Sequence, residues 1–89
     1  MGGLNKATIC KYLKLALRLL LSKADTESLV ASAMSAASLL WMDTTGKTDE
    51  QKRTEAIKIV TSAMKAEGRE IKQRLVEFAI SGALNALKG

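Results

Sequence analysis

The sequence has no proline and no histidine, a single cysteine, and one each of tryptophan, tyrosine and phenylalanine among its 89 residues. Without histidine, a catalytic triad that uses histidine and a zinc site with nitrogen and sulfur ligands are excluded. With Cys10 alone, no disulfide can form within the chain, and we expect this thiol to be a small buried hydrophobe. A proline-free chain rich in alanine, leucine, lysine, glutamate and serine favours helix throughout.

Two pairs of carboxylates lie close together in the sequence and are the candidates for acid–base chemistry. Asp49 with Glu50, and Glu67 with Glu70, each lie near an expected helix end. Helix capping and solvation explain carboxylates in such places better than catalysis does. No glycine-rich phosphate loop is present. We therefore interpret the chain as a non-enzyme with no catalytic residue, no metal or cofactor site and no small-molecule substrate.

The apolar pattern predicts a single all-α domain over residues 1–89, a small four-helix bundle with short connections and antiparallel neighbours. The helices are expected at about 5–24, 26–42, 49–67 and 70–87. Asp25 or Thr26 is the expected N-cap of the second helix, and Thr48 with Gln51 reads as a capping box for the third. Gly68 is a natural residue to follow the end of the third helix.

Helical spacing also predicts which side chains form the core. The last helix has an unusually wide apolar arc, so we expect it to be the most enclosed helix or to face a partner as well. The expected core consists of Leu13, Leu17, Leu20, Leu29, Ala33, Leu40, Ile57, Val60, Met64, Leu75, Phe78 and Ile80.

The net charge of +5 comes entirely from the first 24 residues, which contain basic side chains and no acid. The remaining residues contain nine basic and nine acidic side chains. Lys11, Lys14 and Arg18 fall on one face of the first helix, at i, i+3 and i+7. This asymmetry predicts an anionic partner for the first helix, either a membrane surface or a nucleic acid.

The charges interrupt every apolar run well before the roughly 20 residues that a membrane span needs. The first helix is therefore expected to lie on a surface rather than to cross a bilayer. Nucleic-acid binding ranks lower, because the chain has neither an aromatic set for base stacking nor a helix-turn-helix pattern. In a further alternative, the basic residues only keep a leucine-rich helix soluble while its leucines enter the core.

Four segments of the chain carry a resemblance to a known family: "LVASAMSAASLLW", "GKTDEQKR", "AIKIVTSAMKAEGREI" and "LVEFAISGALNAL". Together they resemble the phage holin family called LLH, or holin superfamily six, over about residues 29–87. The matching features are an alanine-rich helix, a charged loop ending in a basic pair, a helix, a glycine break and a last helix with a Val-Glu-x-Ala pattern. The matching positions are Gly46, Lys52, Arg53, Gly68, Val76, Glu77 and Ala79.

The resemblance implies a small phage or prophage protein that acts at membranes and self-associates. Family members begin with a hydrophobic membrane-spanning helix, whereas this chain has the basic amphipathic helix in that place, which argues against pore formation. We expect a location in the host cytoplasm, at the periphery of the inner membrane. The alternative is a soluble phage interaction protein, virion-associated or host-directed, that binds a protein partner through its first or last helix.

Overall fold

Four α-helices follow one another in the computed structural model: α1 (Lys6–Leu17), α2 (Lys23–Trp41), α3 (Asp49–Ala66) and α4 (Gln73–Lys88). The structure describes residues 6–42 and 46–88. Within these two ranges there is no strand, and each helix packs against at least two others. The all-α, four-helix prediction is therefore confirmed. The expected start of the first helix at Asn5 lies outside the described residues.

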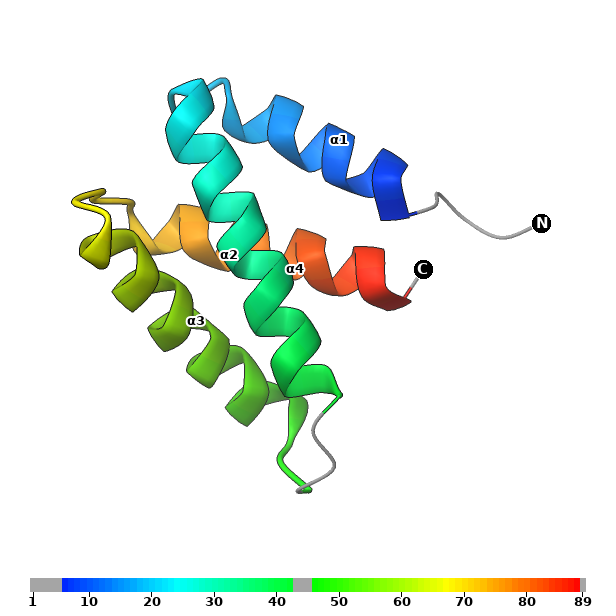
Figure 1. The fold of residues 1–89 in the computed structure, drawn as a ribbon. Helices are drawn as coiled ribbons and strands as arrows, with labels where there is room; N and C mark the ends of the chain where they lie inside the picture. The colour runs from blue at the N-terminus through cyan, green and yellow to red at the C-terminus, as the bar shows by residue number, and fades with distance from the viewer. Residues whose placement is uncertain (1–5, 43–45, 89) are drawn as a thin grey trace.

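The helices form a flat assembly in which α2 and α4 cross at the centre (Figure 1). In the described chain, α3 packs on one flank of this pair and α1 on the other, and α1 does not contact α3. Neighbouring α2 and α3 run in opposite directions, as do α1 and α4 (Figure 1). The Cα atoms extend over 34 × 33 × 16 Å, a thickness of about two packed helices. One face of α1, which carries Lys11, Tyr12, Lys14 and Leu15, is exposed.

Small residues allow α2 and α4 to cross closely. Ala33, Ala36 and Ala37 of α2 are buried, as are Ala79 and Ala83 of α4. Larger buried side chains fill the space on either side of the crossing. Of the expected core, these are buried: Leu13, Leu17, Leu29, Ala33, Leu40, Val60, Met64 and Ile80. Ile57 and Leu75 are partly buried against them.

The prediction that Leu20 and Phe78 lie in the core is wrong. Leu20 is 70% exposed because α1 ends at Leu17, before its helical position could place it against α4. Phe78 is 48% exposed because the buried residues of α4, which include Val76 and Ile80, lie on the opposite side of the helix. The wide apolar arc of α4 is thus only partly covered.

The first helix is shorter than predicted, and the second begins earlier. Ser22, not Asp25 or Thr26, is the N-cap of α2, and its hydroxyl accepts a hydrogen bond from the Asp25 amide at 3.1 Å. Between α1 and α2 the backbone forms a tight turn, in which Leu20 N donates to the Leu17 carbonyl at 2.9 Å. Ser-Lys-Ala-Asp is itself a capping pattern. The Ser22 hydroxyl satisfies the Asp25 amide, which has no partner within the first turn of the helix.

The predicted ends of the third helix are confirmed. Thr48 and Gln51 form a reciprocal capping box at the start of α3. Gly68 follows its end with φ +75°, and Arg69 N donates to the Met64 carbonyl, which completes a Schellman motif. Residues 69–72 then run outside helical structure, so α4 begins at Gln73 instead of residue 70.

An ion-pair network ties this connection to the start of α2. The Arg69 guanidinium lies 2.5 Å from an Asp25 carboxylate oxygen and 3.1 Å from one of Glu67. The Ser28 hydroxyl donates to the same Glu67 oxygen at 2.7 Å. These hydrogen bonds, led by the one from Ser28, lower the pKa of Glu67. The hydrogen bond to Asp25 is the first cause that raises the pKa of Arg69.

Candidate functional site

The predicted basic residues lie together on the surface of α1 and the turn that follows it. Lys11, Lys14 and Arg18 are all exposed. Arg18 lies just beyond the last residue of α1, but its amide still donates to the Lys14 carbonyl at 2.9 Å, so the helical spacing continues through it. None of the three forms an ion pair with any part of the chain that the structure describes. We call Lys11, Lys14 and Arg18 the basic stripe.

A second exposed stripe runs beside the basic one. Tyr12, Leu15 and Leu19 are exposed, with Leu19 at 85%. Tyr12 and Leu15 each follow a residue of the basic stripe, which places them about 100° around α1, and Leu19 lies in the turn after the helix. We call these three side chains the apolar stripe. Leu13 and Leu17 meanwhile point into the core, so α1 has a buried face, a basic face and an exposed apolar face.

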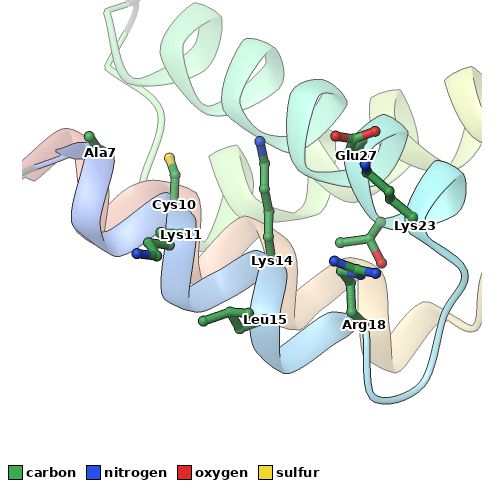
Figure 2. Close-up of a pocket in the computed structure, with 9 residues that line it drawn as sticks. Ala7, Cys10, Lys11, Lys14, Leu15, Arg18, Lys23 and Glu27 are labelled. Atoms are coloured by element: carbon green, nitrogen blue, oxygen red, sulfur yellow. The ribbon is translucent and has the colours of Figure 1, made fainter.

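The basic stripe borders a hollow between α1 and the start of α2. The hollow has a volume of about 440 Å³ and is lined by Ala7, Cys10, Lys11, Lys14, Leu15, Arg18, Lys23, Thr26 and Glu27. Figure 2 shows Lys14 rising from α1 on one side, Lys23 and Glu27 of α2 on the other, and Arg18 where the chain leaves α1. Four cationic side chains and one carboxylate thus line the hollow. The structure brings the predicted residues together and adds Lys23 to them.

Cys10 lies at the wall of this hollow and is only half-buried, not fully buried as predicted. Its thiol points to the Met34 sulfur of α2 at 3.8 Å. The thiol donates a weak hydrogen bond to the thioether, which joins α1 to α2. It helps to hold the two sides of the hollow together.

The sequence did not lead us to predict that α2 contributes residues to this site. Placing the N-cap at Asp25 or Thr26 leaves Lys23 in the first helix and Thr26 at a solvated helix end. With Ser22 as the N-cap, Lys23, Thr26 and Glu27 fall in the first two turns of α2 and face the end of α1. The signal that could have found them is the Ser-x-x-Asp spacing of Ser22 and Asp25.

Within residues 6–42 and 46–88, no helix is both long enough and apolar enough to cross a membrane. No protein-family model matches the chain, and neither the curated proteins nor the solved structures give a significant match.

Proposed function

We propose that this chain is a small, non-enzymatic phage or prophage protein of the holin-like type, and that it lies on an anionic membrane surface through α1. The observation that carries the proposal is the pairing of the basic stripe with the apolar stripe on the open side of α1. Surface-bound amphipathic helices combine these two features, a cationic border beside apolar side chains that enter the acyl boundary. Here the helix can keep Leu13 and Leu17 in the core while it binds.

The expected binding free energies indicate that both stripes are needed for stable membrane binding. Each cation near an anionic bilayer contributes about 1 kcal/mol, so the basic stripe contributes about 3 kcal/mol. Alone, this corresponds to a dissociation constant weaker than about 1 mM. Burying a leucine or tyrosine side chain contributes about 1.5–3 kcal/mol more. We therefore expect electrostatic attraction to bring the protein to the surface and the apolar stripe to retain it there.

The test is flotation with vesicles of phosphatidylcholine alone and of phosphatidylcholine mixed with phosphatidylglycerol. The wild-type chain should float only with the anionic vesicles, and added salt should weaken this binding. A variant with Lys11→Glu, Lys14→Glu and Arg18→Glu should stay folded, because exposed charges contribute little to stability. It should no longer float. A variant with Tyr12→Ser, Leu15→Ser and Leu19→Ser should also lose binding.

A matched control separates the site from the net charge. Lys58, Lys65 and Lys72 are exposed, and none of them forms an ion pair in the described chain. Reversing all three to glutamate changes the net charge by the same amount but leaves α1 intact. This control should bind anionic vesicles more strongly than the α1 variant. An equal loss of vesicle binding in the control and in the α1 variant, or full vesicle binding by the α1 variant, would contradict the proposal.

The second candidate is a soluble phage interaction protein that binds a protein partner or a second copy of itself. The half-exposed Phe78 on α4 favours it, because the ring offers an apolar anchor that the fold does not use fully. Light scattering after size-exclusion chromatography measures self-association. A dimer that Phe78→Ser converts to a monomer, without vesicle binding by the wild type, would favour this candidate over the first.

A further inference from the structure

The hollow between α1 and α2 has an unbalanced charge. Lys11, Lys14, Arg18 and Lys23 line it together with one carboxylate, Glu27. No ion pair joins any of these four cations to the described chain. In contrast, cations and carboxylates pair elsewhere in the described chain, where Arg69 contacts Asp25 and Lys47 contacts Glu55. The hollow therefore carries an excess of positive charge, which Glu27 offsets only in part.

Thr26 lines the same hollow, and its hydroxyl forms no hydrogen bond within the part of the chain that the structure describes. The residue is 0% exposed, so its Oγ1 is a buried polar atom without a hydrogen-bond partner among residues 6–42 and 46–88. A buried hydroxyl without a partner destabilises a fold, and valine has nearly the same shape without that cost. A ligand oxygen entering the hollow would supply the missing partner. Thr26 thus points to a ligand independently of the surrounding charge.

The start of α2 adds to the attraction for an anion. The N-terminal end of a helix carries a partial positive charge, and Lys23 and Thr26 lie in the first turns of this 19-residue helix. Asp25 in the same turn would oppose an anion, but Arg69 neutralises its carboxylate at 2.5 Å. Among the described residues that line the hollow, Glu27 supplies the opposing charge.

We propose that this hollow is a binding site for a phosphate group of the phosphomonoester type. Lys14, Arg18 and Lys23 contact its oxygens, and the Thr26 hydroxyl donates a hydrogen bond to one of them. A dianionic group with three terminal oxygens matches several cationic donors and a hydroxyl better than a single-charged diester does. The Thr26 oxygen is covered in the free protein, so the ligand must displace a side chain. Arg18 and Lys23 are exposed and can move.

This inference goes beyond the proposed membrane function, because it requires a discrete site instead of a charged surface. The phosphate group can belong to a soluble phosphoester or to the headgroup of a lipid such as phosphatidic acid. The hollow, at about 440 Å³, has room for a phosphate group and part of the molecule that carries it. The two sources share the same chemistry and differ only in the attached group.

The experiment is an NMR titration of backbone amides with phenyl phosphate, compared with sodium chloride at the same ionic strength. Phenyl phosphate should give saturable shifts at Arg18, Lys23 and Thr26 that chloride does not give. Thr26→Val should weaken the affinity roughly tenfold, the loss of one charge-assisted hydrogen bond. Thr61→Val, the same change on α3, should leave it unaltered. Glu27→Gln should tighten binding, because it removes the opposing carboxylate.

Vesicles distinguish the source of the phosphate. If the ligand is a lipid, vesicles with phosphatidic acid should bind the wild type more tightly than phosphatidylglycerol vesicles of equal surface charge, and Thr26→Val should abolish only this preference. Without such a preference, a soluble phosphoester is the ligand. Shifts with chloride equal to those with phenyl phosphate, or a Thr26→Val variant with unchanged affinity, would overturn the site. The flotation of phosphatidylglycerol vesicles tests the membrane proposal separately.

Discussion

The backbone of Gly82 in α4 lies directly against the side chain of Leu13 in α1. A Cβ atom placed on Gly82 would lie 2.8 Å from both δ carbons of Leu13, closer than carbon atoms can approach. Leu13 is itself buried, so its side chain has little room to turn away. The glycine therefore sets how closely α1, which carries the basic and apolar stripes, lies against α4.

We predict that Gly82→Ala destabilises the fold by about 1–2 kcal/mol. Overpacking costs about 1–3 kcal/mol, while alanine returns up to about 1 kcal/mol of helix propensity relative to glycine. Chemical denaturation followed by circular dichroism measures the difference. Asn85→Ala, on the exposed side of α4, is the control and should change stability by less than about 0.5 kcal/mol.

A double-mutant cycle identifies the cause. In a Leu13→Ala background the clash is absent, so Gly82→Ala should become neutral or stabilising. If Gly82→Ala costs the same in both backgrounds, the close approach of the two helices does not explain the loss.

Phe78→Ala should cost only about 1 kcal/mol, because the ring is 48% exposed. Leu17→Ala is the comparison. Leu17 is buried at 1% exposure, and its truncation should cost about 2–5 kcal/mol. Urea denaturation of both variants tests this order. A loss above about 3 kcal/mol for Phe78→Ala would mean that the ring is covered in solution, and a dependence on protein concentration would identify a second copy as the cover.

Thr26→Val should raise the stability of the free protein. The substitution keeps the shape of the side chain and removes a buried hydroxyl that has no hydrogen-bond partner in the described chain. We expect a gain of about 1 kcal/mol, which corresponds to roughly 4–8 °C in Tm for a domain of this size. Differential scanning calorimetry in a buffer without phosphate measures it. A lower Tm would show that the hydroxyl is satisfied in solution and would weaken the case for a ligand there.

Glu67 should make the fold sensitive to acid. Its pKa is lowered, chiefly by the hydrogen bond from Ser28 and then by Arg69, so its ionised form stabilises the folded chain. This stabilisation is complete above about pH 4.3, the pKa of a glutamate in an unfolded chain. It is lost as the pH falls through the lower pKa of the folded state. Glu67→Gln should therefore destabilise the protein at pH 7 and differ less from the wild type in acid.

The stability difference between Glu67→Gln and the wild type can be measured by thermal unfolding between about pH 2 and pH 7. Glu70→Gln provides the control, since Glu70 is exposed and forms no ion pair in the described chain. A stability difference between Glu67→Gln and the wild type that stays constant with pH would show that the Ser28 and Arg69 contacts do not hold the ionised carboxylate.

The sequence by itself determined the helical class, the third helix and most of the core. Thr48 with Gln51, and Gly68, act through bonds to backbone groups a few residues away, so their roles could be predicted from local spacing. Leu29, Val60 and Ile80 could be assigned to the core because helical periodicity fixes one buried face for each helix. The exposure of Lys11, Lys14 and Arg18 follows from the same periodicity.

Only the tertiary structure decided which apolar side chains remain exposed and what lies beside the basic stripe. Leu19 and Phe78 are as hydrophobic as the core residues, and their exposure depends on which neighbouring helix reaches them. The hollow with Thr26 exists because α1 stops at Leu17 and α2 starts at Lys23, which brings two chain segments together. Periodicity describes each helix alone, whereas crossing and contact between helices depend on the packing of all four.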